Sequence, residues 1–151
     1  MTESVISKAR PKTPWHLWLV GVLGLFWNGY GAYDYLMTVT RGDPYLREYG
    51  MTEAQIAFFH VMPKWMIADW AVGVWGAALG SVLLLLRSRW AFWAFLASLA
   101  AMLTSLVYSH FLSDGAEVMG SQGAIMSAII TVACLFFVWY AWAMTKRGVL
   151  R

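Results

Sequence analysis

A small number of side chains in this sequence place a reactive group next to a long apolar segment. Asp34 and Asp69 each stand about one turn from the end of such a segment, and His110 stands near the end of another. Ionisable groups inside a membrane are costly, so each one is a functional hypothesis by default. Together with an amide deeper in the first segment, they predict a polar pocket opening at one membrane face. Its expected members are Asn28, Asp34, Asp69 and His110.

The same residues also allow a purely structural interpretation. Asp34 and Asp69 stand close enough to the membrane surface to be hydrated. Each has a basic residue nearby in sequence with which it could pair, Arg41 for the first and Lys64 for the second. Asn28 has the residue type that forms hydrogen bonds between membrane helices. The structural interpretation and the pocket both remain open at this stage.

A metal or haem site is a further alternative that the residue types permit. Asp34, Asp69, His60 and His110 are suitable metal ligands, but they follow no compact ligand spacing. Haem held by two histidines would have to use His60 and His110, because His16 belongs to the opposite end of the first segment. The single Cys134 excludes an intrachain disulfide. No nucleophile–base pair or glycine-rich phosphate loop is visible, so we expect neither an enzyme nor a resident cofactor.

The composition places these residues in a membrane protein. The 151 residues are 60% hydrophobic and 13% charged, with a mean hydropathy of +0.58. Since a span needs roughly 20 apolar residues, the chain has room for four or five spans and no soluble domain. A pI near 9.2 is explained by basic residues at the ends of apolar segments, so we expect no nucleic-acid partner.

Four segments are long and apolar enough to be spans, and all must be helices because lipid offers no partner to backbone amides. Tryptophan and tyrosine residues mark their ends, as in the aromatic belts of membrane proteins. We expect an all-α transmembrane domain over residues 15–145, folded as a left-handed four-helix bundle. Its spans are residues 15–38, 65–86, 90–112 and 123–145.

The distribution of lysine and arginine predicts the orientation. Eight of these residues fall on one side of the predicted spans and three on the other, and the richer side is cytoplasmic by the positive-inside rule. Residues 1–14 and 146–151 are then basic cytoplasmic tails. The cytoplasmic set is Lys8, Arg10, Lys12, Arg87, Arg89, Lys146, Arg147 and Arg151; the outer set is Arg41, Arg47 and Lys64.

The outer connection over residues 39–64 is long enough to contain structure of its own. Residues 41–44 have the composition of a turn. Thr52 followed by Gln55 is a capping box, and it predicts a short amphipathic helix that ends before Pro63.

Each predicted span carries a face of small or polar residues. Such faces allow close backbone approach between membrane helices, and Gly76 to Gly80 is a GxxxG match. We expect these faces to form the helix contacts and the opposite faces, rich in Trp, Leu and Phe, to meet lipid or other membrane subunits. The expected packing residues are Gly21, Gly24, Asn28, Gly31, Gly73, Gly76, Gly80, Ser105, Ser127 and Thr131.

Three stretches carry a resemblance to a known group of proteins: residues 14–18 (PWHLW), residues 26–35 (FWNGYGAYDY) and residues 113–117 (SDGAE). In them the chain resembles a group of small four-span proteobacterial inner-membrane proteins, some of which carry the automatic label "sugar transporter". The resemblance extends across the four spans and brings no catalytic motif. It implies location in a bacterial inner membrane.

The function that we expect is that of a non-catalytic accessory or scaffold subunit of a larger inner-membrane complex, respiratory or photosynthetic. An alternative is a component of a transporter or channel for a small polar solute, although the sequence shows no internal repeat or interrupted helix. A second alternative is a membrane redox or metal-binding protein.

Overall fold

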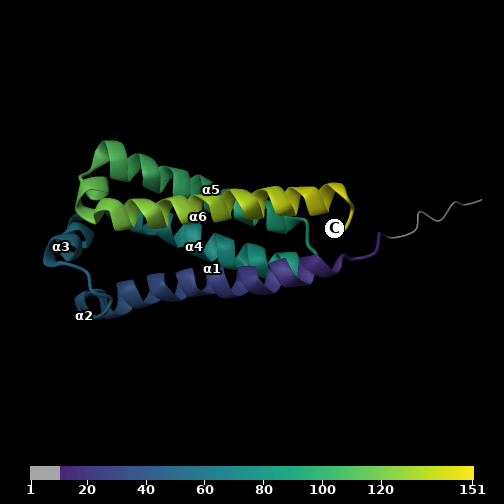
Figure 1. Cartoon of the computed structure of the whole chain (residues 1–151), viewed down its shortest axis with the longest axis horizontal. Coiled ribbons are helices and arrows are strands. Elements are labelled where there is room, and N and C mark those ends of the chain that lie inside the picture. Colours follow the sequence, from purple (N-terminus) through teal and green to yellow (C-terminus); the bar gives the residue numbers. More distant parts are fainter. Residues whose placement is uncertain (1–10) are drawn as a thin grey trace, which may run out of the picture.

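The computed structural model describes residues 11–151, which contain helices and no strands (Figure 1). The predicted cytoplasmic segment 1–14 lies mostly outside these residues. In chain order the elements are α1 (Trp15–Arg41), α2 (Asp43–Glu48), α3 (Glu53–Val61), α4 (Lys64–Leu85), α5 (Trp90–Val107), the π-helical turn η1 (Tyr108–Leu112) and α6 (Gly115–Lys146).

Three of the helices are long and apolar enough to cross a membrane. They are α4, the continuous segment Trp90–Leu112 formed by α5 and η1, and α6. The first predicted span also forms a helix, α1, but α1 does not meet the hydropathy criterion that the other three meet. Its glycines, tyrosines and tryptophans, together with Asn28 and Asp34, lower its mean hydropathy below that of a typical span. The predicted four-span count is thus supported for three helices.

Helix ends agree with the predicted spans to within a few residues except at the start of α6. This helix begins at Gly115, eight residues before the predicted start, and is interrupted at Gly120, whose φ of 62° and ψ of −158° are not helical. Glycine adopts such a conformation at no steric cost. The predicted third span ends in the π-helical turn η1, which the sequence pattern does not indicate.

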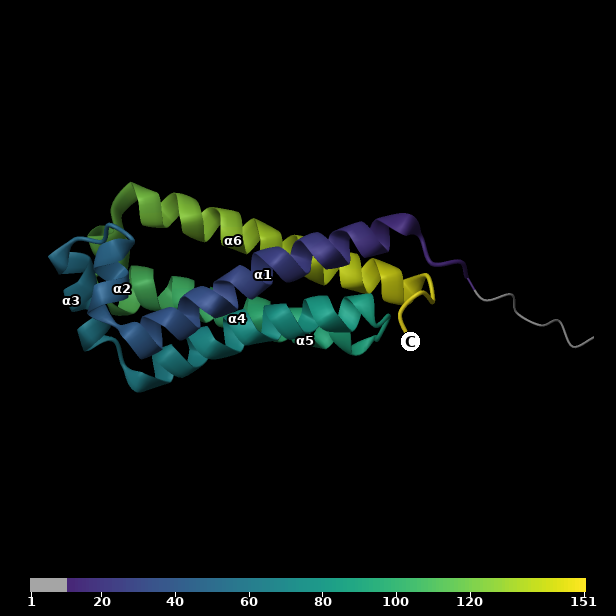
Figure 2. The same cartoon turned by 90° about the horizontal axis from the view of Figure 1, so that it is seen from below.

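The four long helices pack in chain order. α1 packs on α4, α4 on α5, and α5 on α6, while α2 and α3 lie across one end (Figures 1 and 2). We call this end the cap end. The opposite end, which we call the terminal end, comprises residues 11–14, the Arg87–Arg89 connection and residues 146–151. In Figure 2, α1 and α6 cross near the terminal end and diverge toward the cap end.

The main apolar core lies toward the terminal end. Leu17, Leu84 and Phe95 are almost fully buried there, and Phe95 stacks on Phe137 with ring centroids 5.0 Å apart. Residues of all four long helices contribute to this cluster. The helices are consequently held most tightly where α1 and α6 meet.

The predicted outer helix exists, and a second short helix precedes it. The capping box is complete: Thr52 Oγ1 accepts a hydrogen bond from Gln55 N at 3.3 Å, and Gln55 Oε1 accepts one from Thr52 N at 3.0 Å. The expected turn over residues 41–44 instead leads directly into α2. Pro44 in its first turn and Asp43 four residues before Arg47 favour a helix there, because proline fits the first helical position.

Residues 147–151, which belong to the predicted basic tail at residues 146–151, fold back against the helices. After α6, Gly148 turns the chain with a φ of 70°, and Val149 and Leu150 are buried in the main core. Arg151 then forms two backbone hydrogen bonds of 2.9 Å with the α4–α5 connection, one to Arg87 O and one from Arg89 N. Apolar side chains after a helix-ending glycine are the sequence signal for this packing.

Candidate functional site

The expected packing glycines lie at helix contacts on α1 and α4. A methyl group added at Gly80 would lie 2.8 Å from the Phe95 ring, and one at Gly24 would lie 2.7 Å from Phe137. A methyl group added at Gly76 would lie 3.3 Å from the Ala94 carbonyl oxygen. At Gly73 and Gly31 the nearest atom would be farther away, at 3.5 and 3.9 Å. Gly21 lies against the Leu85 side chain. These helices approach closely because the contacting positions lack a β-carbon.

The small-residue face of α6 has a different environment in its first half. Ser127 and Thr131 are half-buried, and the Thr131 hydroxyl donates a hydrogen bond of 2.7 Å to the Ser127 carbonyl of the same helix. Ser105 on α5, by contrast, bonds to a neighbouring helix. The α6 positions therefore have no interhelical hydrogen bond among the described residues.

Asn28 lies in the contact between α1 and α4. Its Nδ2 donates a 2.9 Å hydrogen bond to Ser81 Oγ, which in turn donates to Ala77 O at 3.0 Å. Both side chains are buried. This is the interhelical bond expected of a membrane asparagine.

Asp69 lies between α4 and α5, where Ser105 Oγ donates to its Oδ2 at 3.2 Å. One to two turns deeper, Ser98 Oγ donates 2.7 Å to Gly73 O across the same contact. The two bonds join α4 and α5 at successive levels. Asp69 thus has a serine partner, and the suggested pairing with Lys64 is not formed.

Asp34 lies near the cap end of α1 and accepts a 2.8 Å hydrogen bond from the Tyr45 hydroxyl of α2. Burial of Tyr45, reinforced by this carboxylate, raises the pKa of the phenol to about 12. Arg41 pairs with Glu48 at 3.3 Å, so the suggested Asp34–Arg41 pair is not formed either. The Asp34–Tyr45 bond fixes α2 against α1.

His110 is exposed on η1, and its Nδ1 donates to the Leu106 carbonyl oxygen at 3.0 Å. The predicted pocket residues accordingly bond to four different partners: Ser81 for Asn28, Tyr45 for Asp34, Ser105 for Asp69 and Leu106 for His110. Within residues 11–151, no group of three or more His, Cys, Asp and Glu side chains is placed to hold a metal ion. His60 bonds to Asp43 and not to the other suggested ligands.

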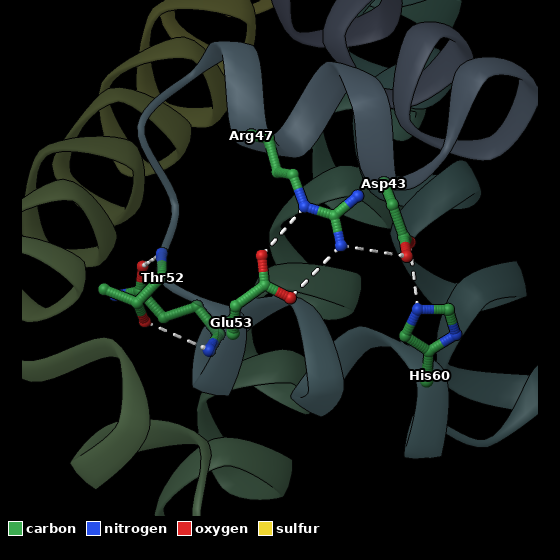
Figure 3. Close-up of polar contacts among 6 residues, drawn as sticks. Asp43, Arg47, Thr52, Glu53 and His60 are labelled. Atoms are coloured by element: carbon green, nitrogen blue, oxygen red, sulfur yellow. Dashed lines mark hydrogen bonds and ion pairs between the residues drawn. The ribbon is translucent and has the colours of Figure 1, made fainter.

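A polar network that the sequence did not predict lies on the cap (Figure 3). Arg47 donates to both carboxylate oxygens of Glu53, at 2.8 and 3.1 Å, and lies 3.9 Å from Asp43. Asp43 in turn lies 2.9 Å from His60 Nε2. The hydrogen bond from Arg47 lowers the pKa of Glu53, and the same bond raises that of Arg47. This network ties α2 to α3.

Beside the network is a cavity of about 290 Å³ with a mostly apolar wall. Asp43 and His60 are its charged or titratable members, and they bond to each other. The remaining wall residues are Thr38, Val39, Gly42, Leu46, Phe59, Met62, Ile67 and Trp70.

A second hollow lies between α1 and α6, where the two helices begin to diverge. Its volume is about 650 Å³, and every residue along it is apolar. Near the terminal end, His16 Nδ1 and the Tyr140 hydroxyl lie 2.5 Å apart and link the two helices. We call this hollow the α1–α6 groove; its residues are Val20, Leu23, Gly24, Trp27, Ile129, Val132, Ala133, Phe136 and Phe137.

Comparisons with known proteins place no relative beside this chain: no protein-family model, no curated protein and no solved structure matches it.

Proposed function

We propose that this chain crosses a bacterial inner membrane four times, with both ends in the cytoplasm, and serves as a non-catalytic accessory subunit of a larger membrane complex. The proposed partner is a transmembrane helix of another subunit, packed in the α1–α6 groove. In this topology, α1 crosses the membrane together with the three helices that are long and apolar enough to do so.

Two observations support α1 as a fourth span. It is 27 residues long and lies alongside α4, with Gly21 and Gly24 buried against its neighbours. The first described residue and the last lie at the same end of the helices, because Pro11 is close to Gly148. An even number of crossings is required when two segments emerge on the same side.

The accessory role is supported by how the polar side chains are used. Asn28, Asp69 and Ser98 join neighbouring helices, and Asp34 joins a helix to the cap. Catalytic or transport sites need polar groups that converge on an open space. These polar groups are instead bonded to other parts of the protein at separate places. This arrangement supports neither a transport pathway nor a redox or metal site.

The α1–α6 groove is the observation that carries the partner assignment. It is apolar along its length, and the small, half-buried Ala133 stands among the large Trp27 and Phe136. Small residues let a helix backbone approach closely, and close packing is the main attraction between helices in lipid. A groove with this lining suits a helix with a small-residue face of its own.

Site-specific crosslinking combined with copurification tests the proposal. A photo-crosslinking amino acid at Leu23 or Val132, two exposed groove positions, should capture one defined protein in cells at native expression level. Val72 and Leu79 on α4 are the matched controls, because each is more than half exposed but lies outside the groove. In mild detergent, Ala133→Trp should remove the same protein from the purified preparation while the chain remains folded. Capture of lipid alone, or of a second copy of this chain, would contradict the proposal.

A further inference from the structure

Basic residues from three separate segments meet at the terminal end. They come from the residues before α1, from the α4–α5 connection and from the end of α6. No aspartate or glutamate occurs in these segments within residues 11–151. The cations are Lys12, Arg87, Arg89, Lys146, Arg147 and Arg151.

These cations differ from the arginines of the cap end in their partners. Arg41 pairs with Glu48, and Arg47 pairs with Glu53. In the part of the chain that the structure describes, none of the terminal-end cations forms an ion pair. The two cap-end arginines are therefore paired with carboxylates, whereas the terminal-end cations have no such partner among the described residues.

The terminal-end cations stand on a fixed backbone. Arg151 is tied by two backbone hydrogen bonds to the connection that carries Arg87 and Arg89. Val149 and Leu150 anchor the same segment, since each is less than 5% exposed, at 4% and 3%. The Arg87 guanidinium also donates 2.9 Å to Thr13 Oγ1, which brings in the segment before α1. The backbone positions that carry Arg87, Arg89 and Arg151 are thus held next to one another.

Arg87 occupies a backbone position that favours glycine. It ends α4 with a φ of 57°, and the hydrogen bonds Ser88 N to Leu83 O and Arg87 N to Leu84 O form a Schellman motif. α6 ends in the same motif, where the corresponding residue is Gly148, with a φ of 70°. A left-handed conformation is unfavourable for residues with a β-carbon. The chain uses glycine at one of the two matching sites and arginine at the other.

Exposed tryptophans mark the level of these cations. Trp15 and Trp90 are 74% and 62% exposed at the first turns of α1 and α5, and Lys146 Nζ lies 5.9 Å from the Trp142 ring centre. Tryptophan gathers at the depth of lipid headgroups. A cluster of cations at that depth faces the phosphates of the adjacent leaflet.

We propose that the terminal end is a binding site for anionic phospholipid headgroups, with Arg87, Arg89 and Arg151 around the phosphate. Arg87 is retained in its unfavourable conformation because its guanidinium contacts the lipid. This inference does not depend on a partner subunit in the α1–α6 groove.

The test measures lipid binding and stability on the same variants. The whole chain is placed in nanodiscs or mild detergent, and binding of phosphatidylglycerol is compared with that of phosphatidylcholine by native mass spectrometry. Wild type should prefer phosphatidylglycerol. Arg87→Gly should lower this affinity about fivefold, the effect of one surface cation, while its unfolding temperature stays equal or rises. Arg89→Gln, which leaves the left-handed residue in place, should weaken binding by a similar factor.

Arg41→Gln is the matched control, because it removes one positive charge from the cap end, where that charge is already paired. It should leave lipid binding unchanged. The inference is overturned if Arg87→Gly and Arg89→Gln bind phosphatidylglycerol as wild type does, or if Arg41→Gln weakens binding as much as they do. Displacement of the lipid by millimolar inorganic phosphate would assign the site to a free anion and overturn the lipid assignment.

Discussion

At the scale of single residues, hydrogen bonds decide what the ionisable and amide groups do. Asn28 bonds to Ser81 and Asp69 to Ser105, so both serve contacts between helices. In lipid, a buried polar group is costly unless it is paired. Pairing makes these groups sources of specificity in helix packing, since only the correct alignment of two helices satisfies them.

Tyr45 gives a prediction that can be measured by titration. Its pKa of about 12, compared with an ordinary value of 10.0, means that the folded protein disfavours the phenolate. The contribution of the protonated phenol to the free energy of unfolding is fully present below pH 10, and it is lost as the pH rises toward 12. We expect alkaline unfolding in this range, measured by circular dichroism in detergent.

Tyr45→Phe is the control for the alkaline titration. It cannot ionise, so its stability should not show the loss between pH 10 and 12 that Tyr45 causes in the wild type. Its difference absorbance at the phenolate wavelength should lack one late-titrating group. A wild-type titration in which every tyrosine ionises near pH 10 would contradict the assigned environment.

At the scale of the elements, glycine positions determine how closely the helices pack. α4 presents Gly73, Gly76 and Gly80 along one face toward α5. The distance from an added β-carbon to the nearest atom of α5 decreases along the helix, from 3.5 Å at Gly73 to 3.3 Å at Gly76 and 2.8 Å at Gly80. The Phe95 ring beside Gly80 is 2% exposed and stacked on Phe137, so it has little freedom to move.

Alanine substitutions along this face should therefore have graded effects. Gly80→Ala should lower the free energy of unfolding by about 1–3 kcal/mol, the usual effect of overpacking. Gly76→Ala should have a smaller effect, and Gly73→Ala should be neutral or stabilising because alanine favours a helix. Unfolding by denaturing detergent measures all three. Equal effects at the three positions would contradict this gradient in packing along the α4–α5 contact.

The elements that the sequence did not predict are short or irregular. α2 has six residues, η1 is a single π-helical turn, and α6 is interrupted at Gly120. Hydrophobic periodicity needs a longer window than any of these provides. Capping signals are local instead, which explains why the Thr52–Gln55 box located α3 correctly.

At the scale of the whole molecule, the two ends of the helix assembly differ in structure and charge. The cap end has two short helices and paired arginines, while the cations of the terminal end form no ion pair within residues 11–151. Under the proposed topology, the cap end faces the periplasm. The apolar outer faces between the ends then contact lipid or partner subunits.

Cysteine labelling in intact cells tests this orientation. Ala54→Cys places a thiol on the exposed side of α3, and Lys146→Cys places one at the terminal end. An impermeant maleimide should label the first in intact cells and the second after permeabilisation. The wild type, whose Cys134 is half-buried in α6, gives the background. Labelling of both thiols in intact cells, or the reverse order, would contradict two cytoplasmic ends.

The sequence by itself determined the helical class, the approximate ends of the long helices, the capping box and most of the glycines at helix contacts. These properties depend on local composition and on periodicity within one helix, so they can be read without knowing the neighbours. The predicted clustering of Asn28, Asp34, Asp69 and His110 depended on which helices are adjacent. That arrangement is not encoded in any single segment.

The tertiary structure alone decided the partners of those four residues, the α1–α6 groove and the folded-back segment at residues 147–151. Each arises from the order in which helices pack and from where they diverge. Part of the low hydropathy of α1 has the same origin, because Gly21, Gly24 and Asn28 lie against α4 and α6, where small size and hydrogen bonding matter more than apolar character. Contacts between distant segments, rather than the content of one segment, determine these features.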